Sequence, residues 1–305
     1  MKKFSILVLG SSSAMATPHR DLSGQVININ EKLILVDCSE GTQNRLRYHK
    51  IRFSRINHIF ISHLHGDHFF GLIGLLSTMH LTGRTAPLKL FAPVELMEII
   101  DLQLRITDTQ LKFEIDFLAV DTRQSKMICD EADFSVTTIP LNHRIECCGF
   151  LFREASHPRK LRKDIAFLEN IPYSEINRIK GGANYRTPDG RLILNKDLIM
   201  NDIRPRTYAY CSDTAFHKPV ADLVKGVDLL YHEATFGNDR LENAEEKFHS
   251  TAEQAATIAV MADVKQLMIG HFSTRYDDPL ILLEQAQAVF PNTIAARDGL
   301  IIDIY

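Results

Sequence analysis

Short apolar runs that end at a metal-binding or acidic side chain recur five times along this chain. Each run is rich in β-branched residues, as expected of strands that are buried on both faces of a sheet. Ligands of layered α/β folds bind beyond the ends of such strands. Strands often end at polar residues, which explains one or two of these runs but not five, so the pattern predicts that polar groups gather at one edge. The runs and their end residues are 56–62 with His63, 134–141 with His143, 207–211 with Asp213, 227–231 with His232 and 264–269 with His271.

Stretches with apolar residues at spacings of three and four lie between these runs and predict helices. One of them opens with Ser250 and Glu253 at the spacing of a capping box, which sets His249 just outside a helix N-terminus. A length of 305 residues fits two domains or a single large α/β layer structure equally well. We expect helices over 41–48, 72–80, 94–107, 218–225, 251–262 and 279–290.

The densest group of possible ligands is the run His63-Leu-His65-Gly-Asp67-His68 at the end of one predicted strand. Alternation along an extended chain puts His63 and His65 on the same side, and the turn at Gly66 lets Asp67 and His68 address a neighbouring point. Imidazole nitrogen and carboxylate oxygen are zinc ligands, and no thiol is required. The run therefore predicts a metal site rather than an exposed polar turn.

The remaining ligands must come from other strand ends. His143 and His271 each follow an apolar run, and Asp213 has two oxygens that could bridge two ions. A single distal histidine is more often an ordinary polar residue, but the shared position at strand ends favours a ligand role. Asp37 is a candidate to orient a ligand histidine. The expected sites are His63, His65, His143 and Asp213 for one ion, and Asp67, His68, Asp213 and His271 for the other.

Six further motifs accompany the H-x-H-x-D-H run. They are Asp37-Cys-Ser-Glu-Gly-Thr-Gln43, His143-(x)5-Gly149-Phe150, Ser212-Asp213-Thr214, His232-Glu-Ala-Thr235, His249-Ser-Thr-Ala-Glu-Gln-Ala-Ala256 and His271-Phe-Ser-Thr-Arg-Tyr276. The H-x-H-x-D-H run resembles the signature of the metallo-β-lactamase fold, and the whole series resembles the ribonuclease Z family in order and spacing. The last two motifs point to that family specifically.

This resemblance implies a fold, an activity and partners. The fold would be a four-layer αββα sandwich, with residues 1–305 as a single domain and an inserted arm that binds tRNA. The activity would be that of an endoribonuclease that removes 3′ trailers from tRNA precursors. Each subunit of a homodimer would hold two zinc ions.

Residue types suggest roles in such a reaction. Two zinc ions would lower the pKa of a shared water to about 7 and hold the scissile phosphate, so that cleavage leaves a 3′-hydroxyl and a 5′-phosphate. Asp67 is predicted to be both a ligand and the base, and His249, which the metal set does not need, to protonate the leaving oxygen. A helix N-terminus disfavours the charged form of His249 unless a carboxylate such as Glu233 compensates. Ser273 and Arg275 are candidate phosphate contacts.

Residues 153–204 differ in character from the rest of the chain. Positive charge is dense there, prolines and a Gly181-Gly182 pair interrupt the sequence, and apolar periodicity is weak. These features predict an inserted basic arm rather than a second domain. The arm lacks the Gly-Pro element that the family usually carries, and a surface insertion without RNA contact is the alternative. The side chains expected to meet a phosphate backbone remote from the cut are Arg159, Lys160, Arg162 and Lys163.

Composition limits the remaining classes. With 35 basic and 38 acidic residues the net charge is −3, so RNA must be met by local basic patches rather than by the whole field. The five cysteines form no C-x-x-C pair, which predicts buried thiols in the reducing cytoplasm. No apolar run approaches the roughly 18 residues that would span a bilayer. A second basic group that could bind phosphate comprises Arg45, Arg47, Lys50, Arg52 and Arg55.

Two other functions stay open from the sequence. One is a hydrolase of the same fold that acts on another small phosphodiester or ester. The other is a metal-stabilised RNA-binding protein without turnover, which needs the ligands but not His249.

Overall fold

The computed structural model describes residues 3–156, 159–200 and 204–305. It divides into two compact units: the first comprises the described residues up to Arg153 and from Arg206 on, and the second those between Glu154 and Pro205. Among the described residues, no helix is both long enough and apolar enough to cross a membrane.

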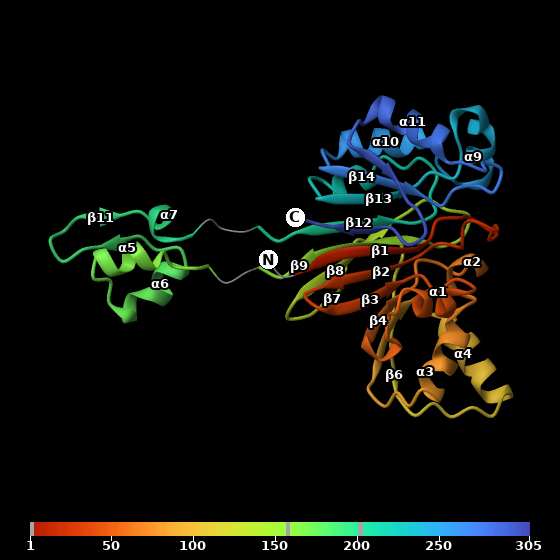
Figure 1. Cartoon of the computed structure of the whole chain (residues 1–305), viewed down its shortest axis with the longest axis horizontal. Coiled ribbons are helices and arrows are strands. Elements are labelled where there is room, and N and C mark those ends of the chain that lie inside the picture. Colours follow the sequence, from red (N-terminus) through yellow and green to blue (C-terminus); the bar gives the residue numbers. More distant parts are fainter. Residues whose placement is uncertain (1–2, 157–158, 201–203) are drawn as a thin grey trace. The chain divides into compact units, whose positions relative to one another are not determined.

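The first unit contains two seven-stranded sheets (Figure 1). In the first sheet the N-terminal strands pair antiparallel, whereas β3, β4, β5 and β6 run parallel. The chain ends of β3 and β4 therefore lie at the same edge of this sheet. Its strands in spatial order are β16 (Ile301–Asp303), β1 (Phe4–Gly10), β2 (Gly24–Ile29), β3 (Lys32–Val36), β4 (Ile56–Phe60), β5 (Leu88–Ala92) and β6 (Ile115–Ala119).

The second sheet has a parallel half and an antiparallel half. Strands β12 to β15 pair parallel, and β9 pairs antiparallel with β12. The carboxyl ends of β12, β13 and β14 thus share one edge. The strands in spatial order are β15 (Thr293–Ala295), β14 (Gln266–Gly270), β13 (Leu229–Glu233), β12 (Thr207–Cys211), β9 (Cys148–Glu154), β8 (Phe134–Pro140) and β7 (Met127–Asp130).

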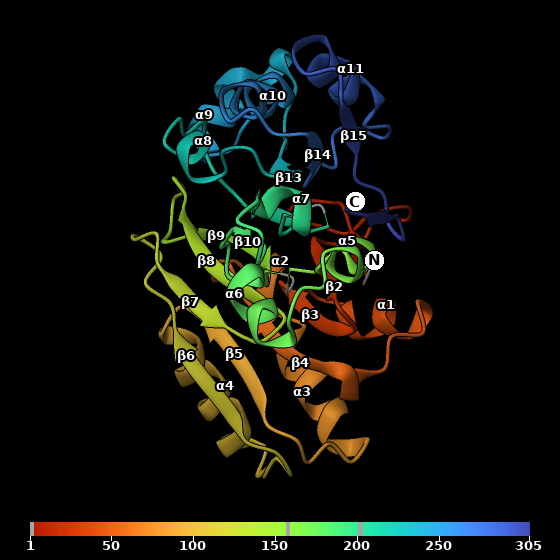
Figure 2. The ribbon, with the colours of Figure 1, turned by 90° about the vertical axis from the view of Figure 1, so that its left-hand side faces the viewer.

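Three apolar clusters define the layers of this unit. The central cluster joins the inner faces of the two sheets, where Phe60 stacks on Phe91 at 4.3 Å between ring centroids and meets Phe150 edge-on at 5.3 Å. Each outer cluster joins the other face of one sheet to helices. In Figure 2, α10 (Ala252–Met261) and α11 (Leu280–Val289) lie beyond β13 and β14. The helices α3 (Leu72–Leu81) and α4 (Glu95–Ile106) lie beyond β4 and β5. The predicted four-layer αββα arrangement is confirmed.

The predicted helices form, mostly within one or two residues of the expected bounds. One cap differs: Thr251 and Gln254 make the capping box, because the Ser250 hydroxyl donates to the Thr214 carbonyl instead. A helix that the sequence analysis did not predict precedes His249. The helices are α1 (Thr42–Tyr48), α2 (Gly66–Phe69), α3 (Leu72–Leu81), α4 (Glu95–Ile106), α8 (Val220–Leu223), α9 (Leu241–Lys247), α10 (Ala252–Met261) and α11 (Leu280–Val289).

The second unit has its own small apolar cluster. Ile179, Tyr185, Leu198 and Ile199 are buried within it. Charge pairs that are local in this unit join Arg178 to Glu175 and Arg191 to Glu169. Its elements are α5 (Lys163–Leu168), α6 (Ile176–Lys180), the two-stranded sheet of β10 (Tyr185–Arg186) and β11 (Leu192–Ile193), and α7 (Asn195–Leu198).

Gly149 in β9 permits the close pairing of β9 with β12. A Cβ atom at this position would lie 2.2 Å from the Tyr210 carbonyl oxygen and 3.2 Å from the Cys211 Cα. Both obstructing atoms belong to the backbone of the strand that leads to Asp213, so neither can move without shifting that strand.

We therefore expect Gly149→Ala to lower the free energy of unfolding by about 1–3 kcal/mol, the usual cost of overpacking a core. Denaturant titration measures the change. Gly74→Ala is the matched control: the added Cβ lies 3.4 Å from the nearest atom, in the side chain of Gln43, and alanine is the better helix former. A variant Gly149→Ala as stable as the wild type would contradict this account of the strand pairing.

Candidate metal centre

Polar side chains from both sheets meet at the edge where the parallel strands end. In the first sheet His63 follows β4, and His65, Asp67 and His68 lie in or next to the short helix α2. In the second sheet Asp213 and His271 follow β12 and β14, and His143 lies between β8 and β9. The structure thus brings together all seven predicted ligands. It does not bring His232 to them, because this residue lies within β13, fully buried, with its ring Nδ1 bonded to the Glu233 carbonyl.

The first donor group comprises three histidines and one oxygen of Asp213. His65 Nδ1 lies 3.1 Å from both His63 Nε2 and His143 Nε2. Asp213 Oδ2 lies 3.6 Å from His63 Nε2 and 3.8 Å from His143 Nε2. The four donor atoms lie within 4.8 Å of one another, which suits a single cation.

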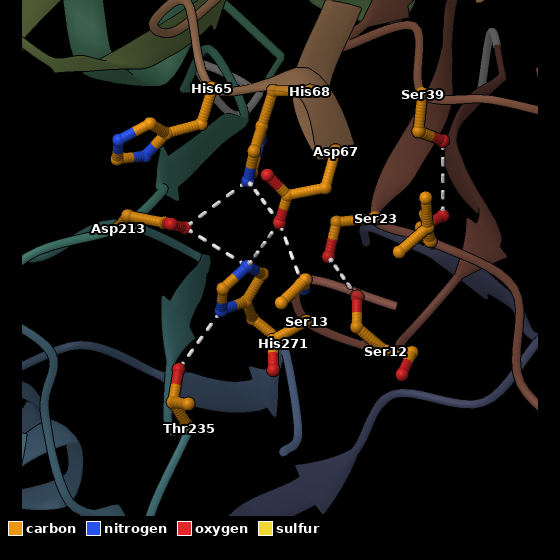
Figure 3. Close-up of polar contacts among 12 residues, drawn as sticks. Ser12, Ser13, Ser23, Ser39, His65, Asp67, His68, Asp213, Thr235 and His271 are labelled. Carbon is orange, nitrogen blue, oxygen red and sulfur yellow. Dashed lines mark hydrogen bonds and ion pairs between the residues drawn. The ribbon is translucent and has the colours of Figure 1, made fainter. Parts of the chain in front are cut away.

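The second donor group uses the other oxygen of Asp213 (Figure 3). Asp213 Oδ1 lies 3.2 Å from His271 Nε2 and 3.4 Å from His68 Nε2. Asp67 Oδ2 lies 3.6 Å from His68 Nε2 and 3.7 Å from His271 Nε2. Asp213 Oδ1, His68 Nε2 and His271 Nε2 are buried without a hydrogen-bond partner. Buried polar atoms rarely lack partners, so these three atoms fit a site that binds a cation.

Asp37 fixes the orientation of one of these ligands. It follows β3 at a positive φ of 56°, and its Oδ2 lies 2.8 Å from His68 Nδ1. The same carboxylate accepts hydrogen bonds from the Ser62 N–H at 2.8 Å, the Ser62 hydroxyl at 3.0 Å and the Tyr210 hydroxyl at 2.8 Å. Held in this way, His68 presents Nε2 to the second donor group, as outer hydrogen bonds do in metal sites.

Glu233 holds His249 beside the metal centre. Glu233 is fully buried at the end of β13, and its Oε1 lies 2.8 Å from His249 Nδ1. Its Oε2 accepts hydrogen bonds from the backbone N–H and the hydroxyl of Thr235. The His249 ring lies 5.1 Å from the His143 ring and 5.5 Å from that of His271, between centroids.

The electrostatics separate His65 and His143 from His249 and from His68, since burial would lower the pKa of His68 but the charges of Asp213 and Asp37 raise it well above its usual range. Burial lowers the pKa of His65 and His143, which keeps both rings neutral and able to ligate a cation. Burial alone would also lower the pKa of His249, but the Glu233 charge and hydrogen bond raise it to about 9. The compensating carboxylate that a charged His249 requires is therefore present. Burial would raise the pKa of Asp213, yet the charges of His271 and His68 hold it well below its usual range.

The predicted substrate contacts differ in exposure. Ser273 is buried, and its N–H donates to the Thr235 carbonyl, whereas Arg275 is exposed. In the second unit Lys160, Arg162 and Lys163 are exposed and Arg159 is half-buried.

Two members of the second basic group, which comprises Arg45, Arg47, Lys50, Arg52 and Arg55, form ion pairs within the chain. Arg45 Nε lies 2.9 Å from an Asp21 oxygen, and Arg55 lies 2.9 Å from Glu31. Arg45 and Arg55 are thus already neutralised by carboxylates of the chain.

Sequence reasoning missed four supporting groups. Ser62 and Tyr210 bind Asp37, the Ala14 N–H donates to Asp67 Oδ2 at 2.8 Å, and the Thr235 hydroxyl lies 2.9 Å from His271 Nδ1. Of these four groups, only Thr235 belongs to a motif described above, His232-Glu-Ala-Thr235. Arg144 was also missed: its Nη2 lies 3.3 Å from His65 Nε2.

Comparison with known proteins gives full-length relatives. The chain is 48% identical over 304 residues to Ribonuclease Z of Bacteroides fragilis (strain YCH46), covering 100% of both chains. It is 44% identical over 304 residues to Ribonuclease Z of Porphyromonas gingivalis (strain W83), with the same coverage. A family model described as Anti-Pycsar protein Apyc1 matches residues 4–169.

Solved structures show the same fold. The short form of human tRNase Z is similar with a TM-score of 0.72 and 27% identity, covering 99% of each chain. The metallo-beta-lactamase fold protein YhfI from Bacillus subtilis is similar with a TM-score of 0.70 and 17% identity, covering 99% of this chain and 100% of that one. The metallo-β-lactamase fold predicted from the sequence is therefore confirmed.

The shared position of Asp213 predicts unequal losses of metal. Asp213→Ala removes a donor atom from both groups and should abolish most binding of zinc, whereas His271→Ala should abolish binding at one group only. Elemental analysis of protein loaded with zinc and then desalted gives the number of ions retained.

The exposed His19 provides the control variant His19→Ala, which should retain the full complement. If Asp213→Ala kept as much zinc as the wild type, the assignment of these donors would be wrong.

Proposed function

The chain belongs to the ribonuclease Z family, and its residues 4–169 belong to the Anti-Pycsar protein Apyc1 family. Because the match to ribonucleases Z covers the whole chain, we propose that the protein is an endonuclease that removes the 3′ trailers of tRNA precursors. The tRNA would retain a 3′-hydroxyl and the trailer a 5′-phosphate. The observation that carries the proposal is the convergence of six possible ligand residues on Asp213, with three buried ligand atoms left without a hydrogen-bond partner, in a chain that matches ribonucleases Z over its whole length.

We propose two zinc ions as the cofactor of each subunit. Seven imidazole and carboxylate residues form two groups, and Asp213, a member of the first, also lies 3.4 Å from His68 and 3.2 Å from His271 of the second; this supports zinc at both positions. His63, His65, His143 and Asp213 would hold one ion, and Asp67, His68, Asp213 and His271 the other. Such a pair, when bound, lowers the pKa of water to about 7 and neutralises the transferring phosphate.

Asp67 and His249 would handle the protons of the reaction. The Ala14 N–H donates to Asp67 Oδ2 at 2.8 Å and would hold this carboxylate in place as the base. Burial would raise the pKa of Asp67, but His271 and His68 hold it below its usual range. Asp67 would therefore accept a proton only transiently. His249, kept charged by Glu233, would donate a proton to the departing 3′ oxygen.

The residues between Glu154 and Pro205 would bind the body of the tRNA as a basic arm. The exposure of Lys160 and Lys163 supports phosphate contacts there, whereas the exposed Arg162 is paired with Asp164 at 2.9 Å between Nη2 and Oδ2. Arg275 would contact phosphate nearer the cut, next to buried Ser273. Contacts with the phosphate backbone position a nucleic acid without reading its sequence, which suits a substrate recognised as a folded tRNA.

We also propose that the enzyme works in the cytoplasm as a homodimer. All five cysteines are free and buried, as suits a reducing compartment. The dimer rests on family membership and is supported by apolar side chains exposed near α2 and α4, including Phe70 and Ile106.

The function is tested with zinc-loaded protein on three substrates in parallel: a precursor tRNA, a tRNA that ends in CCA, and a nitrophenyl phosphodiester. We expect cleavage of the precursor at the 3′ end of the tRNA. Turnover of the small ester alone would support another hydrolase of this fold. Binding of the precursor without turnover of either substrate would support an RNA-binding protein.

Loss of the proton donor should affect the two substrates unequally. His249→Ala should retain zinc and RNA binding but lose about 10²–10⁴ in the rate of precursor cleavage, the usual range for a general acid. The loss should be smaller with the nitrophenyl ester, because nitrophenolate leaves without a proton. Single-turnover rates on both substrates measure the difference.

Glu233→Gln is the companion variant for this test. Removal of the charge that raises the pKa of His249 should move the alkaline limb of the rate profile to lower pH, since the protonated form acts. Equal losses on both substrates in His249→Ala would remove His249 from the acid role.

The arm should matter only for the large substrate. Replacement of residues 154–205 by a short Gly-Ser linker removes no metal donor, so hydrolysis of the nitrophenyl ester should stay within a few-fold of wild type. Cleavage of precursor tRNA should fall by orders of magnitude, because remote binding positions the scissile bond. Rates below saturation at moderate salt measure both effects.

The milder variant Lys160→Gln with Lys163→Gln should weaken precursor cleavage and reduce its dependence on salt. Equal activity of the linker variant and the wild type on precursor tRNA would show that these residues are a surface insertion without a role in RNA binding.

A further inference from the structure

A second group of possible metal ligands lies between the two sheets, outside the centre described above. A ring nitrogen of His58, the Cys129 sulfur and a carboxylate oxygen of Glu131 all lie within 4.8 Å of one another. His58 belongs to β4 of the first sheet, Cys129 to β7 of the second, and Glu131 follows β7. The three donors therefore join opposite sheets.

The surroundings keep these donors in place. His58 is 9 % exposed, and its ring lies 5.4 Å from the Phe134 ring and 6.5 Å from that of Phe91, between centroids. Its Nε2 lies 3.2 Å from Glu131 Oε1, while its Nδ1 is buried without a partner. Burial lowers the pKa of His58, which favours the neutral ring that a ligand requires. Cys129 is 6 % exposed.

Lys89 provides the positive charge at this group in the metal-free protein. Its Nζ lies 2.6 Å from Glu131 Oε1, and Lys89 pairs with His58 in the register of β4 and β5. The lysine side chain is 42% exposed, so it can turn into water and release the carboxylate. A divalent cation would replace the ammonium as the partner of Glu131.

We propose that His58, Cys129 and Glu131 form a third, structural site for a thiophilic divalent cation of the zinc class, which links the two sheets. One thiolate, one imidazole and one carboxylate are ligands of zinc and cobalt, with water as a fourth, and the Cys129 thiol would release its proton to solvent as the cation binds. Magnesium and calcium are disfavoured, because they prefer oxygen ligands and only one donor is a carboxylate. Ligand atoms around a tetrahedral zinc lie about 3.3–3.8 Å apart, so small rotations of side chains suffice to close the group.

Cobalt substitution tests this site, because a thiolate ligand gives a charge-transfer band in the near ultraviolet that imidazole and carboxylate do not. The full chain, stripped of metal by a chelator, is titrated with Co²⁺. The catalytic donor groups contain no thiol, so we expect the band to report only the third ion. Cys129→Ser should lose the band and one of three bound ions while hydrolysing the nitrophenyl ester as the wild type does. Lys89→Met should bind the third ion more tightly.

Cys147→Ser is the control, because this buried thiol interacts with the charge of Asp213 in the catalytic donor groups. The variant should keep the band, which would show that the band does not come from those groups. His58→Asn gives an independent loss of the site if Cys129→Ser does not fold. A wild-type protein that binds Co²⁺ without the band, or a band that persists in Cys129→Ser, would overturn the proposal. Neither result bears on tRNA cleavage, which is assayed separately.

Discussion

The buried carboxylate of Asp213 is the constraint that the rest of the structure accommodates. A buried anion is costly unless opposite charges and donors surround it. Here the rings of His63, His65 and His143 lie around one oxygen of Asp213, and those of His68 and His271 lie around the other. These histidines come from both sheets. Parallel strands bring these groups together because their carboxyl ends share an edge. Metal binding would then be coupled to the docking of one sheet on the other.

The hydrogen bonds that hold the ligand residues in place also connect the two sheets. Asp37 belongs to the first sheet, and one of its hydrogen bonds comes from Tyr210 in the second. The Tyr210 ring stacks on the Tyr231 ring at 4.9 Å between centroids, within the central apolar cluster. The packing of aromatic side chains between the sheets thus sets the position of the carboxylate that orients His68. The position of this proposed metal ligand therefore depends on side-chain packing in the core as well as on the loop that carries the ligand.

The strand ends and the donors could be predicted from the sequence because each depends on local pattern. β12 forms over its predicted bounds, and the helices lie close to theirs, since apolar periodicity determines both. The support from Ser62, Tyr210 and the Ala14 N–H could not be predicted, because it depends on which strands become neighbours. The shift of the capping box from Ser250 to Thr251 has the same origin: a tertiary partner, the Thr214 carbonyl, takes the serine hydroxyl. The small cluster around Tyr185 lacks a clear period and was likewise beyond a sequence argument.

The residues between Glu154 and Pro205 separate two strands that are direct neighbours, since Thr207 of β12 pairs with Arg153 of β9. During synthesis the ribosome must therefore complete this whole insert before β9 receives its partner. At about 5–20 residues per second the wait lasts several seconds. Throughout it β9, with Phe150, Leu151 and Phe152 in its centre, presents an unpaired edge of the kind that recruits other strands. The insert thus imposes a delay on the folding of the second sheet, during which the free edge of β9 is open to pairing with other chains.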